Sequence, residues 1–258
     1  MKDQLLLGNR LRNFRKRYGL SQMDLEIKIE ASPGSISRME NGEVNPTKET
    51  IYKISDELNL TNQERQFLYG SWFYPANDDE VQSAIDDTSE YFSQNGTLGY
   101  ILDERFRFIT ISKSFQKFLG YSDAQVKSTY KQPFLKLILE DNLKIKSLVP
   151  PEEFESILRN LLASFYADCG FMVDDDIYLS QLDSIKADPL GKKLWEEIIK
   201  SPIRKYNDES TRKVIFKIAG FVINMHFIRE PLYRNRRFEI VEYVPEHKFI
   251  KFISKLIM

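Results

Sequence analysis

Few residues in this chain have the types and spacing that catalysis or metal binding requires. Cys169 is the single cysteine, and the two histidines, His226 and His247, form no zinc-ligand spacing with it. The patterns GxGxxG, GxxxxGK[ST] and GxSxG are absent. We therefore expect no catalytic residue, no metal site and no enzymatic activity.

Three consecutive carboxylates, Asp174, Asp175 and Asp176, are a further candidate for a cation site. Neighbouring side chains point in different directions on a helix or a strand, so they converge poorly on one ion. An acidic cluster at the start of a helix, where the dipole favours negative charge, is the preferred interpretation. His226 alternates with apolar strand residues, which favours a solvated or sheet-partnered histidine.

Binding chemistry is better represented, in the stretch from Ser21 to Gly42. Apolar residues keep helical spacing in both halves, and Ala31-Ser32 lies between the halves. Ser32 is expected to cap a second helix that begins with Pro33 and ends at Gly42. Two short helices joined in this way form a helix-turn-helix, whose second helix enters the DNA major groove.

Positive charge is clustered on the helix predicted over residues 5–18, which precedes this stretch. Residues 1–70 have a net charge of only +1, but five basic residues share that helix: Arg10, Arg12, Arg15, Lys16 and Arg17. We expect some of the five to contact phosphates. An ordinary solvated helix face is the alternative interpretation.

Residues 7–70 resemble the XRE family, the Cro/repressor-type helix-turn-helix. The likeness is carried by Leu20-Ser21-Gln22, Ala31-Ser32, Ile36-Ser37-Arg38, Glu40-Asn41-Gly42 and Asn45-Pro46. The resemblance implies that Gln22 lies against the DNA backbone and braces the recognition helix, that Asn41 contacts phosphate, and that Arg15 pairs with Glu40 structurally. It places at the major groove Pro33, Gly34, Ser35, Ser37 and Arg38. A small helical bundle without a DNA partner is the alternative.

Arg38 is the strongest candidate for reading a base. Pro33 and Gly34 lack the long polar side chain that such a contact needs, whereas an arginine can bond guanine in bidentate fashion for about 1–3 kcal/mol of discrimination. Ser35 and Ser37 suit either bases or phosphate. The small residues allow closer approach and shape readout, and a Pro-Gly start is also compatible with weak specificity.

The chain has 258 residues, of which 42% are hydrophobic, enough for two domains with real cores. The net charge of -1 says nothing in favour of DNA. A single cysteine, no apolar leader and no stretch approaching a membrane span favour a cytoplasmic protein without membrane contact.

The order of predicted elements suggests an α+β protein. Thr47 and the capping box of Thr61 and Glu64 begin a fourth and a fifth helix. Residues 67–75 are rich in aromatic side chains. They either form an interdomain or dimer contact or pack against the fifth helix. An acidic helix is predicted over 79–93. Strands are expected over 99–103, 106–111, 213–218, 221–228 and 237–244, and helices over 152–168, 174–186, 190–199 and 249–258.

The carboxy-terminal half resembles a PAS domain. Two strands are followed by short helices that end near Gly120-Tyr121-Ser122, and Asn59 to Leu68 together with Leu194-Trp195 are similar to MmyB-like regulators. The domains implied are a lambda-repressor-like helix-turn-helix domain of five helices (1–72), a linker helix (73–97) and a PAS-like antiparallel sheet with covering helices (98–258).

A PAS-type sheet covered by helices can hold a ligand between the two layers. The candidate lining residues are Phe108, Phe115, Phe118, Leu161, Phe165, Phe216, Met225 and Phe227. Each of them also suits an ordinary core. The family implies a small apolar, fatty-acid-like molecule, and no other cofactor is expected.

We therefore expect a homodimeric transcription regulator that binds double-stranded operator DNA and whose PAS-like domain senses a ligand, dimerises, or does both. The alternative is a prophage-type or partner-controlled repressor whose carboxy-terminal half is a protein-interaction module without a small ligand.

Overall fold

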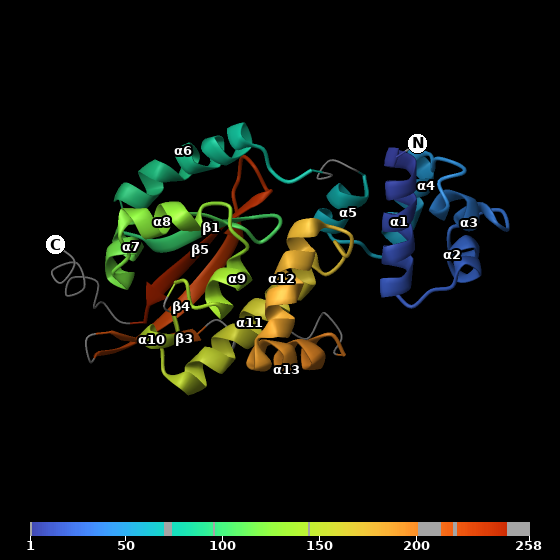
Figure 1. The fold of residues 1–258 in the computed structure, drawn as a ribbon. Coiled ribbons are helices and arrows are strands. Elements are labelled where there is room, and N and C mark those ends of the chain that lie inside the picture. Colours follow the sequence, from blue (N-terminus) through green and yellow to red (C-terminus); the bar gives the residue numbers. More distant parts are fainter. Residues whose placement is uncertain are drawn as a thin grey trace. The chain divides into compact units, whose positions relative to one another are not determined.

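The computed structural model describes residues 2–69, 74–94, 96–143, 145–200, 213–218 and 221–246. The chain divides into two compact units (Figure 1). Unit 1 comprises Met1–Pro75 with Gly170–Val173, and unit 2 comprises Ala76–Cys169 with Asp174–Met258. Helices alone are described in unit 1 and helices with one sheet in unit 2, which agrees with the predicted α+β class.

Unit 1 contains the helices that the sequence predicted. Their bounds are α1 (Lys2–Arg17), α2 (Gln22–Lys28), α3 (Ser35–Glu40), α4 (Lys48–Glu57) and α5 (Asn62–Leu68). Thr47 caps α4 through Thr50, and Thr61 and Glu64 form the predicted capping box of α5. Side-chain caps of this kind satisfy backbone N–H groups that have no partner within the helix.

The core of unit 1 is formed by the apolar sides of these helices. Phe14, Leu25, Ile36 and Ile54 are fully buried, as their helical spacing predicted. Unit 1 also includes the short segment 170–173, whose Phe171 stacks on Phe14 with ring centroids 5.4 Å apart. This segment comes from a part of the sequence about a hundred residues beyond α5.

Unit 2 is built on a five-stranded antiparallel sheet in the order β2-β1-β5-β4-β3. The strands are β1 (Leu98–Asp103), β2 (Phe108–Ile111), β3 (Lys213–Ile218), β4 (Phe221–Pro231) and β5 (Phe238–Pro245). The predicted meander of the last three strands is confirmed. β1 and β5, the first and last strands of the sequence, pair with one another, which joins β1 and β2 to the meander of β3, β4 and β5.

Helices cover the sheet of unit 2 (Figure 1). They are α6 (Asp78–Gln94), α7 (Lys113–Leu119), α8 (Asp123–Thr129), α9 (Phe134–Leu139), α10 (Ile145–Leu148), α11 (Pro151–Cys169), α12 (Asp176–Ala187) and α13 (Pro189–Ile198). α11, α12 and α13 match the predicted long helices within a few residues. The predicted closing helix over 249–258 lies outside the described residues.

The two faces of the sheet pack against different helices. On one face, α6 buries Val81, Ala84 and Phe92 against Ile101, Phe238 and neighbouring residues. On the other face, α7, α9, α10 and α11 pack over the aromatic residues Tyr100, Phe108 and Tyr243. Alternation along β1 therefore sends Tyr100 and Ile101 into two separate cores, and every residue of this strand is buried.

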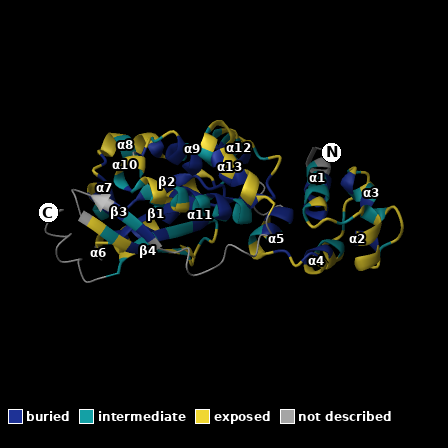
Figure 2. Cartoon of the chain, turned by 90° about the horizontal axis from the view of Figure 1, so that it is seen from below, coloured by how far each residue is buried: buried dark blue, intermediate teal, exposed yellow. Residues whose placement is uncertain are grey.

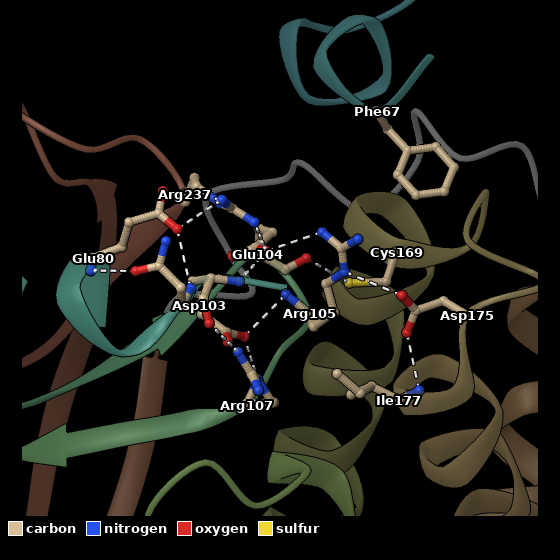
Figure 3. A network of polar contacts seen from close by, with 12 residues as sticks. Phe67, Glu80, Asp103, Glu104, Arg105, Arg107, Cys169, Asp175, Ile177 and Arg237 are labelled. Atoms are coloured by element: carbon tan, nitrogen blue, oxygen red, sulfur yellow. Dashed lines mark hydrogen bonds and ion pairs between the residues drawn. The ribbon is translucent and has the colours of Figure 1, made fainter. Parts of the chain in front are cut away.

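β2 begins at Phe108, two residues later than predicted, because Phe106 has a positive φ of 60° that a strand cannot include. The residues between β1 and β2 form instead a turn fixed by charge (Figure 3). The Asp103 carboxylate accepts backbone N–H groups of Arg105 and Arg107 and pairs with the Arg107 guanidinium at 2.5 Å. This turn replaces the first two residues of the predicted strand.

The same turn holds several distant segments of unit 2. Glu104 accepts hydrogen bonds from the Ala76 backbone at 3.1 Å and from Arg237, the residue before β5, at 2.7 Å. Arg105 pairs with Asp175, the N-cap of α12, at 3.2 Å (Figure 3). The start of the unit at Ala76 and the start of α12 are thus bonded to one turn.

Some aromatic residues near the end of α5 are placed by the structure. The Phe67 ring packs edge-on against the Phe14 ring, with 6.5 Å between the ring centroids. The ring centroids of Tyr69 and Tyr52 lie 5.4 Å apart. These two residues therefore pack within unit 1. Trp72 and Phe73 lie outside the described residues, and Tyr74 is largely exposed.

Candidate nucleic-acid interface and ligand cavity

A buried ion pair fixes α3 to α1. The Arg15 guanidinium donates two hydrogen bonds of 2.6 and 2.9 Å to the Glu40 carboxylate, and Glu40 is fully buried. Gln22, the first residue of α2, donates to the same carboxylate at 2.8 Å. Burial acts to raise the pKa of Glu40, but hydrogen bonds from Arg15 and Gln22 outweigh it and hold this pKa below its ordinary value.

The start of α3 differs from the prediction. Gly34, with φ 76° and ψ 0°, is the N-cap, and α3 begins at Ser35 rather than at Pro33. The Ser35 N–H donates to the Ser32 carbonyl at 3.1 Å, so Ser32 to Ser35 form a type II turn with proline and glycine in the middle. A helix cannot continue through a left-handed residue, which is why the predicted cap at Ser32 is wrong.

The next backbone N–H of α3 is satisfied by a residue that the sequence interpretation missed. Glu26 of α2 is buried, and its carboxylate accepts the Ile36 N–H at 3.0 Å. This bond joins the two helices of the motif at the point where α3 begins. The sequence signal for this contact was an acidic residue at a position of α2 that faces the core.

The outward side of α3 is the part of the motif that can meet a ligand. Buried and exposed positions alternate along α3 (Figure 2). Ile36 and Glu40 are buried, whereas Arg38 is exposed and Ser37 is half-buried. Pro33 and Gly34 are exposed in the turn before α3, and Asn41 is exposed after its end. This side therefore presents an arginine guanidinium, a hydroxyl and an amide on a helix whose opposite side is fixed.

Four of the five basic residues of α1 have structural partners. The guanidinium carbon of Arg17 lies 5.7 Å from the centre of the Phe171 ring. Arg10 is buried, donates to the Phe67 carbonyl at 2.7 Å and lies 3.8 Å from the centre of the Phe67 ring. Arg15 holds Glu40, and Arg12 bonds the side chains of Glu40 and Asn41. Lys16 is exposed. The cluster is thus largely internal, and Lys16 is its member best placed to meet a phosphate.

In unit 2, the face of the sheet opposite α6 borders a small cavity of about 40 Å³. Its lining is contributed by strands β1, β2, β3 and β5 and by helices α7, α9, α10 and α11 with the loops beside them. The residues are Tyr100, Phe108, Ile111, Phe115, Leu119, Tyr121, Phe134, Ile138, Leu143, Ile145, Ile157, Leu161, Val214, Phe216 and Tyr243. All of these side chains are apolar or are tyrosines.

Residues 6–68 match the family model described as a helix-turn-helix domain. This region is a helix-turn-helix domain. The match runs from α1 into the last turn of α5 and includes the fixed frame and the outward side of α3 described above. No curated protein matches the chain. Domains of this kind act by placing the second helix of the motif in the DNA major groove, so the match indicates a DNA-binding regulator.

The predicted DNA-contacting residues have different surroundings in the helix-turn-helix domain. Gln22 bonds Glu40 of α3, which is the bracing that the resemblance implied, and Asn41 is held by Arg12 at 2.8 Å. The Ser35 hydroxyl is buried without a hydrogen-bond partner in the described part of the chain, so it does not lie on the outward side of α3. Arg38 and Ser37 point outward from the frame.

The predicted ligand-contacting residues are only partly brought together. Phe108, Phe115, Leu161 and Phe216 line the cavity, and Phe118 packs beside it on Phe115 and Phe216. Phe165 does not line the cavity, and its ring contacts Tyr178, Trp195 and Phe106. Met225 is buried in β4 and Phe227 is half-buried in the same strand, and neither lines the cavity. The tyrosines of the lining were not predicted.

Asp175, His226 and Cys169, which were considered for catalysis or metal binding, have ordinary structural surroundings, and His247 lies outside the described residues. Asp175 caps α12 by accepting the N–H groups of Ile177 and Tyr178, and His226 lies 3.0 Å from Glu246. Burial raises the pKa of the Cys169 thiol well above its usual value. Among the described residues, no three His, Cys, Asp or Glu side chains are arranged to hold a metal ion. No described helix is long and apolar enough to cross a bilayer.

Proposed function

We propose that the chain is a sequence-specific transcription regulator of the XRE type, whose helix-turn-helix domain binds a two-fold DNA operator as a homodimer. The observation that carries this proposal is the outward side of α3, because it presents Arg38 on a helix whose other side is fixed by Glu40. Duplex DNA admits a helix of this kind in its major groove.

Arg38 is the residue assigned to base readout. Its side chain is exposed at the middle of α3, and an arginine there can donate two hydrogen bonds to one guanine. Asn41 and Lys16 are assigned to phosphate contacts. Asn41 directly follows α3, Lys16 lies in the last turn of α1, and both residues are exposed. Pro33 and Gly34 shape the turn and supply no base contact of their own.

Replacing Arg38 with alanine tests this assignment. After selection of a preferred operator with the wild-type protein, Arg38→Ala should weaken binding by about tenfold to a hundredfold and relax the preference at one base pair. Lys53→Ala, an exposed lysine on α4, is the matched control and should leave affinity within about twofold. Binding is measured by fluorescence anisotropy at one fixed salt concentration. Unchanged affinity of Arg38→Ala would contradict the base-reading assignment.

For unit 2 we propose the sensing of a small apolar ligand in the cavity beneath the sheet, in the manner of PAS-like domains of MmyB-like regulators. Two strands, intervening helices and a final three-stranded meander support this assignment, as does the wholly apolar and tyrosine lining. A ligand there can alter DNA binding only by its different affinity for two arrangements of the protein.

A second candidate, control by a protein partner, is supported by a different observation. Val222 and Ile228 of β4 and Val244 of β5 are exposed apolar residues. Such residues suit a protein contact when they are contiguous. Stabilisation of the protein that rises with the concentration of an apolar compound supports sensing, and no response to any compound supports the partner.

A further inference from the structure

Among the described residues, no charged side chain lines the unit 2 cavity. The lining side chains there are apolar or tyrosine, so they offer a bound anion no counter-ion. The cation with the strongest influence on Tyr100 is Arg229, and its guanidinium is already held between Asp168 and Glu239. Burying an unpaired carboxylate is strongly unfavourable.

Among the described lining residues, the polar side-chain groups are tyrosine hydroxyls. The Tyr121 hydroxyl donates to the Leu143 carbonyl. The rings of Tyr100 and Tyr243 lie with their centroids 6.2 Å apart, and their hydroxyls are hydrogen-bonded to one another. Burial raises the pKa of both hydroxyls above the ordinary tyrosine value, so both are neutral. Two hydroxyls carry two donors, and their mutual bond uses one. The second O–H has no other partner among the described residues and can donate to a ligand.

Aromatic rings dominate the wall around this tyrosine pair. The Phe216 ring stands edge-on to Tyr243 at 5.4 Å and to Phe115 at 6.4 Å, an arrangement that a further ring can join. The cavity of about 40 Å³ is smaller than the roughly 150 Å³ that holds benzene, so the wall must open. Ile145, Ile157 and Leu161 are half-buried and form the outer part of that wall.

We propose that the ligand of unit 2 is a small neutral aromatic molecule with one hydrogen-bonding group, which meets the hydroxyls of Tyr100 and Tyr243. This inference rests on the proposed sensing function and narrows it. A fatty acid, the ligand that the family resemblance implies, would bring a carboxylate into a wall whose described side chains include no cation. A single ring also demands the smallest opening of the cavity.

Four probes with the full-length protein test the inference at pH 7.5: p-cresol, toluene, 4-methylbenzoate and octanoate. Dissociation constants are measured by isothermal titration calorimetry. We expect p-cresol to bind at least tenfold more tightly than either anion, and Tyr243→Phe to weaken p-cresol about fivefold while leaving toluene unchanged. Leu161→Trp, which fills the outer wall, should abolish binding of both neutral probes.

Each contrary result has a separate meaning. Equal affinity for 4-methylbenzoate or octanoate overturns the neutral-ligand inference and leaves ligand sensing in place. An equal loss of toluene and p-cresol in Tyr243→Phe overturns the role of the tyrosine pair, and Tyr100→Phe provides the same comparison if the first variant does not fold. No binding of any probe to the folded wild type overturns both the inference and the proposed sensing function.

Discussion

Glu40 shows how one buried carboxylate can orient a recognition helix. It lies at the end of α3 without solvent exposure and receives hydrogen bonds from Arg15, Gln22 and Arg12, so residues of α1 and α2 all act on it. A buried charge of this kind is expensive unless it is fully paired. The pairing of Arg15 with Glu40, which the resemblance implied, is confirmed, whereas the internal role of Arg10 was not predicted.

Glu40→Gln should destabilise unit 1 by about 3–5 kcal/mol, because Arg15 would remain buried without its counter-ion. The free energy of unfolding is measured by urea denaturation, and the amide signals of α1 and α3 report on unit 1. Glu57→Gln removes an exposed pair with Lys28 and should cost less than about 1 kcal/mol. Similar losses in both variants would contradict the structural role of Glu40.

The same carboxylate sets a pH dependence. Its folded pKa lies below the ordinary value of 4.5, so the unfolded state binds the proton more readily. Its contribution is therefore complete above pH 4.5 and is lost as the pH falls through the folded pKa. The wild type should lose stability over this range more steeply than Glu40→Gln does.

At the scale of elements, α1 and α3 approach one another unusually closely at Gly8. A Cβ built on Gly8 would lie 2.6 Å from the carbonyl oxygens of both Met39 and Glu40. These are backbone atoms at the end of α3, so they cannot move aside as a flexible side chain can. The glycine lets the two helices come together, and the Arg15–Glu40 pair then joins them.

Gly8→Ala should therefore destabilise unit 1, although alanine normally favours a helix by about 1 kcal/mol over glycine. We expect a loss of about 1–3 kcal/mol from the forced separation of α1 and α3. Asn9→Ala, on the same helix, is the control and should be neutral or slightly stabilising. Thermal denaturation followed by circular dichroism measures both, and a stabilised Gly8→Ala protein would refute the close approach.

At the scale of the whole molecule, unit 1 is not a continuous piece of sequence. Phe171, between α11 and α12, is buried in unit 1, and its ring lies 5.4 Å from Phe14 and 5.2 Å from Phe67. The helix-turn-helix domain matched at residues 6–68 thus has a core residue that lies outside the matched range. Sequence patterns are local and gave no signal for it.

Phe171→Ala should lower the stability of the helix-turn-helix domain by about 3–5 kcal/mol, as expected for removal of a buried aromatic ring. Amide hydrogen exchange in α1 and α5 of the full-length protein measures the effect. Val173→Ala, at a more exposed position of the same segment, is the matched control. Equal protection of α1 and α5 in the two variants would show that Phe171 adds nothing to this core.

The sequence by itself determined the helices, the strands and the motif, because spacing, caps and alternation are set within a few residues. Helical spacing predicted the sides of α1 to α4 that are buried, and capping residues placed the starts of α4 and α5. The exceptions are the starts of α3 and β2, where the positive φ angles of Gly34 and Phe106 override the local pattern, since one residue's φ angle decides whether an element can begin. The short helices α8, α9 and α10 were not predicted either.

Only the tertiary structure decided which residues meet. It paired β1 with β5, separated Phe165 and Met225 from the cavity, brought the tyrosines Tyr100 and Tyr243 together and placed Phe171 in unit 1. The physical reason is that burial and charge pairing depend on contacts between residues up to about 150 positions apart, and no local period in the sequence encodes them.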